Sequence, residues 1–226
     1  MRKASSDYLP AFRFSVLAPF YDPIVALTLR ERTFKHELRR QADTGPGHAV
    51  LDVGCGTGTL AIWMKQACPE IAMTGLDADP AMLARARGKA ERAGVNIAFE
   101  QGLSSHLPYA DRTFDRVVSS LFFHHLTRAE TEKTVVEMFR VLKPDGLLCV
   151  ADWGKPTNVL MRLLFWPVQV FDGFSRTRDN VAGLLPQLFR QGGFAEVTVQ
   201  GSLATVHGSL AFYRAAKPSA DGEEQG

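Results

Sequence analysis

The chain has 226 residues, 46% of them apolar, and a formal net charge of +2. This length and apolar content suffice for one α/β domain with a full hydrophobic core and a small appendage. Basic and acidic residues are interspersed along the chain rather than gathered in runs, so the charge gives no indication of a nucleic-acid partner.

The three cysteines, Cys55, Cys68 and Cys149, have neither metal-ligand spacing nor the even number of a disulfide framework. The first ten residues lack the apolar stretch of a secretory signal. We therefore predict a cytoplasmic protein with reduced thiols and no bound metal.

The N-terminal residues 1–43 are predicted to form a helical cap. Residues 23–41 have a helical pattern, and the turn cluster DTGPG at 43–47 separates them from the first strand. Residues 30–40 (RERTFKHELRR) make a cation-rich helix face. Such a face is usually only solvated, and docking to an anionic lipid surface is the alternative.

A glycine-rich loop follows a short apolar strand at residues 49–53. Gly54, Gly56 and Gly58 let the backbone turn where a Cβ would clash, so a ligand can touch main-chain atoms there. A second strand at 71–76 ends at Asp77, whose carboxylate can accept hydrogen bonds from both hydroxyls of a ribose. The pattern predicts a site for a nucleoside-bearing cofactor.

The spacing of the loop decides which cofactor fits. A dinucleotide loop has glycines in the order G-x-G-x-x-G, whereas here the last glycine comes one residue early, at Gly58, and Thr59 follows it. Asp52 would repel a pyrophosphate, but an ammonium group could approach it through the loop amides or water. A cationic nucleoside that bears an amino acid therefore fits better than NAD.

The rest of the chain alternates strand and helix, which predicts a doubly wound, parallel α/β sheet. Asp79 and Pro80 make a good helix start. The predicted elements are strands near 49–53, 71–76, 96–100, 114–119 and 146–151, helices near 58–67, 80–93 and 128–142, and a closing antiparallel pair at 194–200 and 205–214. The last residues, 217–226, are polar and predicted to be a disordered tail.

Residues 158–174 are rich in bulky apolar side chains, but Arg162, Pro167, Gln169 and Asp172 interrupt them, so a bilayer-spanning helix is excluded. Because this segment follows the fifth strand, it should lie over the carboxyl edge of the sheet, where ligands bind. We predict a lid at about 154–183 that supplies an apolar acceptor pocket. Ordinary packing against the N-terminal helices is the alternative.

Several motifs in succession resemble those of class I S-adenosylmethionine-dependent methyltransferases, in the group of the ubiquinone and menaquinone biosynthesis methyltransferases. The motifs are residues 50–58 (VLDVGCGTG), 75–79 (GLDAD), 107–119 (LPYADRTFDRVVS), 124–126 (HHL) and 139–146 (FRVLKPDG). The resemblance implies a Rossmann-like seven-stranded sheet, mostly parallel with an antiparallel C-terminal strand, in a domain at 44–216. It implies S-adenosylmethionine as cofactor and methyl transfer as the reaction, and it leaves the acceptor open.

Methyl transfer from a sulfonium requires alignment in water-poor surroundings, and a base only where the acceptor must lose a proton. The best candidate base is His125, just past the fourth strand, and His124 could equally be the one that points inward. Local packing and turn capping by both histidines is the alternative. Tyr21 matches the tyrosine that in this family closes over the methionine part of the cofactor, and in some relatives it pairs with a histidine at the His125 position.

One segment departs from the family pattern. Relatives commonly have Gly-Asp-Ala before Leu-Pro, with the aspartate accepting from the adenine amino group, but here Leu103 takes that place. Ser104, Ser105 or a backbone group could substitute, or packing against Ala78 and Leu103 could hold the adenine. The predicted cofactor-binding residues are Tyr21, Asp52, Gly54, Cys55, Gly56, Thr57, Gly58, Asp77, Ala78, Leu103, Ser104 and Ser120.

The sequence bears on three other functions. A nucleobase or glutamine amino-methyltransferase would carry an Asn- or Asp-Pro-Pro-aromatic segment where this chain has Ser119-Ser-Leu-Phe122. A nicotinamide oxidoreductase is disfavoured by the glycine spacing. A sensor or partner subunit that binds the cofactor without catalysis is the remaining alternative to a methyltransferase with a small, lipophilic or aromatic acceptor. The oligomeric state is not determined by the sequence.

Overall fold

The computed structural model describes residues 30–219, apart from the side chains of residues 171, 172 and 174–176. Tyr21, most of the expected cap and residues 220–226 lie outside this part of the chain. The elements are α2 (Glu31–Ala42), β1 (Ala49–Val53), α3 (Thr59–Ala67), β2 (Ala72–Asp77), α4 (Pro80–Arg92), β3 (Ala98–Gln101), β4 (Phe114–Ser120), the 3₁₀ helix η2 (Phe123–His125), α5 (Arg128–Val141), β5 (Leu142–Trp153), α6 (Val159–Leu164), α7 (Trp166–Asp172), α8 (Phe174–Ala182), α9 (Leu185–Gln191), β6 (Ala195–Thr205) and β7 (Gly208–Ala216).

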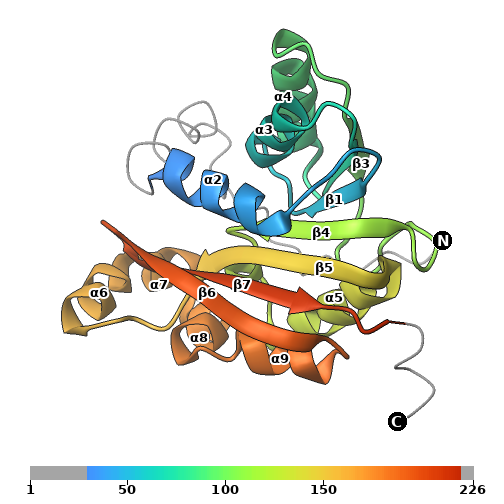
Figure 1. Ribbon diagram of the computed structural model, residues 1–226. Coiled ribbons are helices and arrows are strands. Elements are labelled where there is room, and N and C mark those ends of the chain that lie inside the picture. Colours follow the sequence, from blue (N-terminus) through green and yellow to red (C-terminus); the bar gives the residue numbers. More distant parts are fainter. Residues whose placement is uncertain (1–29, 220–226) are drawn as a thin grey trace, which may run out of the picture.

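The strands form one seven-stranded sheet in the order β3-β2-β1-β4-β5-β7-β6 (Figure 1). Strands β1 to β5 are parallel, and β7 is antiparallel to both of its neighbours. The strand order reverses between β1 and β4, which is the place where doubly wound sheets bind ligands. The predicted mostly parallel sheet with an antiparallel C-terminal strand is confirmed.

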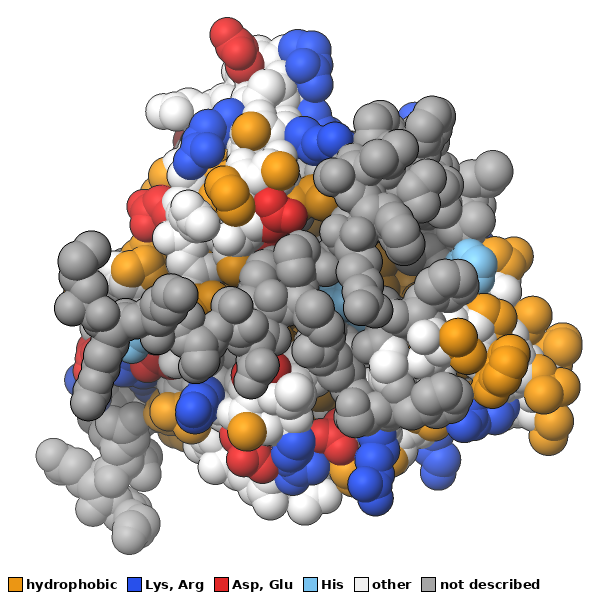
Figure 2. Space-filling view, turned by 180° about the vertical axis from the view of Figure 1, so that it is seen from behind, with side chains coloured by type: hydrophobic (Ala, Val, Ile, Leu, Met, Phe, Trp, Pro, Cys, Tyr) orange, Lys and Arg blue, Asp and Glu red, His pale blue; other side chains and the backbone are white. Residues whose placement is uncertain are grey.

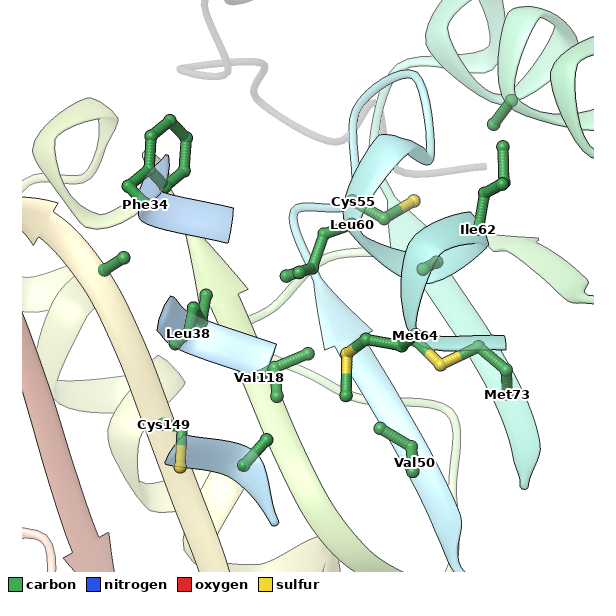
Figure 3. Close-up of a cluster of buried hydrophobic side chains, with 14 of the residues drawn as sticks. Phe34, Leu38, Val50, Cys55, Leu60, Ile62, Met64, Met73, Val118 and Cys149 are labelled. Carbon is green, nitrogen blue, oxygen red and sulfur yellow. The ribbon is translucent and has the colours of Figure 1, made fainter. Parts of the chain in front are cut away.

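Helices cover both faces of the sheet because successive strand residues point to opposite sides. On β5, Leu147 and Cys149 pack on the face of α2 and α3, whereas Leu148 and Val150 pack on the face of α5 and α9. Figure 3 shows the first of these cores, where residues of α2 and α3 meet those of the strands. Burial on both faces explains why the central strands have continuous apolar sequences.

Helix α2 packs with Phe34, Leu38 and Ala42 against the sheet. Lys35 pairs with the buried Glu31, and the exposed Arg40 pairs with Glu37, so part of the predicted cationic face is neutralised within the helix. No described helix combines the length and the apolar character that crossing a membrane requires.

Several elements differ from the sequence prediction, among them β6, which runs to Thr205 rather than 200. Strand β5 begins at Leu142 rather than 146, because Leu142 already pairs with Phe114 and the following turn bulges out of the ladder. Helix α9, which has Pro186 in its first turn, was not predicted; its buried Leu188 and Phe189 fill the core beside α5. Three short helices, α6 to α8, occupy the segment between β5 and α9 where the lid is predicted.

Candidate active site

The glycine-rich loop is fastened to the end of the neighbouring strand. The amides of Gly54 and Cys55 both donate to the carbonyl oxygen of Leu76, at 2.8 and 3.0 Å. Gly54 has a φ of +70°, and a Cβ on it would lie 2.2 Å from the ring of Phe122. Only glycine fits there, because the loop after β4 packs directly on the loop after β1.

Gly56 differs from Gly54 because no described side chain crowds it. It has a φ of +54°, and a Cβ on it would meet no atom of residues 30–219 within 4 Å. Its amide donates to Oδ2 of Asp77 at 2.8 Å. Gly58 begins helix α3 and packs against Phe99. Gly56 is therefore the loop position at which another molecule can approach the main chain.

These two glycines allow a matched test. Alanine at Gly54 should displace Phe122 and lower the free energy of unfolding by roughly 2 to 4 kcal/mol, because steric overlap adds to the unfavourable positive φ. Alanine at Gly56 should cost only about 1 kcal/mol, from the backbone conformation alone. Chemical denaturation of both variants measures the difference, and equal losses would contradict these separate roles.

Asp77 closes β2 and faces the loop. Its Oδ2 accepts from the amide of Gly56 and its Oδ1 from that of Asp79, at 2.8 and 2.9 Å. Burial raises the pKa of Asp77, and the two amides partly offset this effect. Each carboxylate oxygen retains further acceptor capacity, so the group can still receive hydroxyl hydrogen bonds.

The loop after β3 adds an apolar surface beside Asp77. The amide of Gly102 donates to the carbonyl of Asp77 at 3.1 Å, and the next residue, Leu103, is 53% exposed. The hydroxyl of Ser104 lies 2.8 Å from that of Thr134 on α5. Ser104 is therefore bonded to α5. Of Leu103 and Ser104, the exposed Leu103 is the residue that a bound molecule can contact more easily.

Asp52 is the predicted site residue with the most unusual surroundings. It is buried at the carboxyl end of β1, and neither of its carboxylate oxygens has a hydrogen-bond partner among the described residues. Burial, with the nearby charge of Asp77, raises its pKa from 3.8 to about 7, although Lys35 opposes the shift. A buried carboxylate without a partner is costly, so a cationic group beside it would be stabilising. Asp52 therefore fits the ammonium of an amino-acid-bearing cofactor.

The other two predicted loop residues shape the loop. The hydroxyl of Thr57 accepts from Nζ of Lys89 on α4, at 3.0 Å. Cys55 is buried, and burial raises the pKa of its thiol well above the ordinary value. A neutral buried thiol is a poor nucleophile, so Cys55 has a place in the loop but no catalytic role.

The predicted histidines lie beyond β4, at the same edge of the sheet. Ser119 ties this strand to β1 by donating to the carbonyl of Val53 at 2.8 Å, and Ser120 ends the strand. His124 is buried, and its Nδ1 lies 2.8 Å from Oδ1 of Asp152. His125 is partly exposed, with its ring centroid 4.0 Å from that of His124.

Asp152 organises this half of the site, although the sequence analysis did not single it out. Its Oδ2 accepts from the amides of Phe122 and Phe123, and its Oδ1 from the amides of Trp153 and Asn180 as well as from His124. Because a carboxylate only accepts, Nδ1 of His124 carries the proton. An acid near the carboxyl end of an otherwise apolar strand was the sequence signal that could have revealed it.

The structure thus gathers the predicted residues into two groups at one sheet edge. The carboxyl ends of β1 and β2 and the loops after β1, β2 and β3 supply the first group: Asp52, Gly54, Cys55, Gly56, Thr57, Gly58, Asp77, Ala78 and Leu103. Ser120, His124 and His125 form the second, after β4. Ser104 is turned toward α5, and Tyr21 lies outside the described residues.

Comparison with known proteins places this arrangement in a family. A model described as a methyltransferase domain matches residues 50–146. The demethylmenaquinone methyltransferase of Thermus thermophilus is 35% identical over 178 residues, which cover 76% of either chain. That of Deinococcus radiodurans is 34% identical over 155 residues, 67% of this chain and 63% of the relative, so the match spans less than two thirds of that protein.

The fold agrees with solved structures as well. An N-methyltransferase of Haemonchus contortus, solved with phosphomonomethylethanolamine and S-adenosylhomocysteine, superposes with a TM-score of 0.66 at 16% identity, over 83% of this chain and 53% of that one. The matched residues 50–146 contain both groups of site residues described above. The chain therefore belongs to the class I S-adenosylmethionine-dependent methyltransferases, and it resembles the ubiquinone and menaquinone biosynthesis methyltransferases.

Proposed function

We propose that this protein transfers a methyl group from S-adenosylmethionine to a small, lipophilic or aromatic acceptor. The observation that carries the proposal is the buried carboxylate of Asp52, which has no hydrogen-bond partner among the described residues and lies near the carboxylate of Asp77, which accepts from the amide of Gly56. When bound, S-adenosylmethionine supplies a sulfonium methyl group. The residues of the chain have to hold it, orient the acceptor and exclude water.

Each group of residues has a distinct task in this proposal. Asp52 pairs with the ammonium of the methionine part, and Asp77 accepts from the ribose hydroxyls. Ala78 and the exposed Leu103 pack against the adenine, in place of the aspartate that relatives commonly have there. Tyr21 covers the methionine part, by resemblance to the family.

A quinol-like acceptor is favoured by two observations. Curated relatives at about 34% identity are named as demethylmenaquinone methyltransferases. The segment that follows β5 is rich in apolar residues, and it is bonded to the site because Asn180 of α8 donates to Asp152. We propose that this segment is a lid whose inner side contacts the acceptor.

His125 is our candidate for the base that removes a proton from the acceptor. It lies at the carboxyl edge of the sheet, partly exposed, and its ring rests against His124, which Asp152 holds in place. Replacing His125 by Ala should lower kcat roughly 10²- to 10⁴-fold, because general-base catalysis is lost, and should leave cofactor affinity within about twofold. Steady-state kinetics and calorimetry measure the two quantities.

His106 provides the control, because it is an exposed histidine on the neighbouring loop after β3. Its replacement by Ala should leave kcat nearly unchanged. Unchanged turnover in the His125 variant would eliminate His125 as the base and leave His124 as the residue to test.

Release of S-adenosylhomocysteine, measured with a panel of quinols, phenols, amines and lipids, tests the function. We expect turnover with at least one quinol or phenol and none without acceptor. Tight cofactor binding without turnover on the whole panel would instead favour a sensor or partner subunit, which the family match does not support. The free cysteines Cys55, Cys68 and Cys149 are consistent with action in the reducing cytoplasm.

A further inference from the structure

The helices α6 and α7 present apolar side chains outward to an unusual degree. Val159, Leu160, Leu163, Trp166 and Val170 are 77%, 60%, 66%, 58% and 51% exposed, and we call these five residues the α6–α7 face. Figure 2 shows apolar side chains gathered at the end of the molecule that α6 occupies. Single exposed apolar residues are ordinary, whereas a contiguous group of large ones marks an interaction surface.

The burial pattern of these helices is inverted. No residue of α6 is buried, although five of its six residues are apolar. Among the described side chains of α7 the polar Gln169 is the buried one, donating to Thr177 at 3.1 Å and accepting from Arg162 at 2.5 Å. A helix with its amide inside and its Trp outside is suited to an apolar medium on its outer side.

The charges around the face indicate what that medium is. Between Gly154 and Phe171 the chain has two cations, Lys155 and Arg162, and the first acid is Asp172, the last residue of α7. Both cations are exposed. Cations beside inserted Leu and Trp side chains match a bilayer that carries anionic headgroups. From this complementarity we infer that the α6–α7 face docks the protein on an anionic lipid bilayer.

This surface differs from the cationic helix α2, where Lys35 and Arg40 are paired with acids of the same helix. It also connects the bilayer to the reaction edge. Thr177 and Asn180 of α8 bond to Gln169 and Asp152, so the segment that touches lipid outside is fixed to the site inside. A lipophilic acceptor could pass from the bilayer to the site along α8 only if the proposed function is correct. Docking on the bilayer does not depend on that function.

Co-flotation with vesicles tests docking without cofactor or acceptor. We expect the full chain to float with vesicles of phosphatidylcholine and phosphatidylglycerol, and less with phosphatidylcholine alone. Replacing Leu160 and Leu163 together by Gln should weaken binding tenfold or more, because two inserted side chains are lost. Their exposure means that the variant should keep its melting temperature.

Val136 on α5 gives the matched control, since it is 55% exposed but lies on a different helix. Its replacement by Gln should leave flotation unchanged, and so should replacement of Arg32 on α2 by Gln. Trp166 adds a local readout, because its fluorescence should shift to the blue and be quenched by brominated lipid. The variant Trp166→Phe should lose this response. Its two remaining tryptophans, the buried Trp153 and Trp63, which stacks on His36, lie outside the α6–α7 face.

Three results would overturn the inference. Absence of flotation by the wild-type chain would mean that another segment or partner covers the face. A dimer that the Leu160 and Leu163 substitutions dissociate, with no vesicle binding, would assign the face to a second copy. Equal flotation of the double variant and the wild type would place lipid contact elsewhere. Normal cofactor binding in the same preparations would keep any of these failures separate from a failure of the proposed function.

Discussion

Replacement of Asp52 by Asn is expected to make the cofactor-free protein more stable. Folded Asp52 keeps its proton up to about pH 7, because burial raises its pKa, whereas the unfolded residue ionises near pH 3.8. Between these values the folded state binds more protons, so the free energy of unfolding falls as pH rises. Asn does not titrate, and its advantage should therefore grow by roughly 4 kcal/mol from pH 4 to pH 7 and then stay constant.

Thermal and urea unfolding across this pH range measure the effect. Asp77→Asn is the matched control, since Asp77 accepts two backbone amides and its replacement should lower stability by about 1 kcal/mol. The Asp52 variant could instead be no more stable than the wild type at pH 8. That result would show that the carboxylate is already stabilised within the folded protein, and it would contradict the role of Asp52 as a partner for a bound cation.

Replacement of Asp152 by Asn should have the largest destabilising effect. The carboxylate accepts from the amides of Phe122, Phe123 and Trp153 and from the side chains of His124 and Asn180. An Asn amide in either orientation would set its NH₂ group against at least two of these donors. We expect a loss of roughly 2 to 4 kcal/mol and a fall in Tm of about 5 to 15 °C.

Asp115→Asn is the control for this prediction. Asp115 also accepts a backbone amide and pairs with Lys143, but it is only partly buried. Its replacement should cost less than about 1 kcal/mol because solvent screens the pair. Calorimetric melting of both variants compares them, and similar values of Tm would mean that the Asp152 network adds little to the stability of the reaction edge.

The sequence predicted the sheet and the cofactor loop well, because local rules decide both. Apolar runs bounded by turns located the strands, and the spacing of Gly54, Gly56 and Gly58 indicated the loop. The sequence did not show that Gly54 and Gly56 have different surroundings. Gly54 is required by the ring of Phe122, a residue 68 positions later in the chain, whereas no described side chain crowds Gly56.

The region after β5 could be predicted only in part. Its apolar content suggested a lid over an acceptor pocket, but composition does not say which side chains point inward. Gln169, taken in the sequence only as an interruption of the apolar run, is buried, and Trp166 is exposed. The bonds of Asp152 and Asn180 join residues 28 positions apart, so they follow from the fold rather than from any local motif.

Calorimetric titration of the wild-type chain with S-adenosylmethionine at pH 8 tests most directly whether these residues form a cofactor site. The account predicts saturable binding at one site, an affinity that falls as the pH is lowered below about 7 and Asp52 becomes protonated, and a loss of at least tenfold in Asp52→Asn. Absence of binding by the folded wild-type protein, or equal affinity in the Asp52 variant, would contradict it.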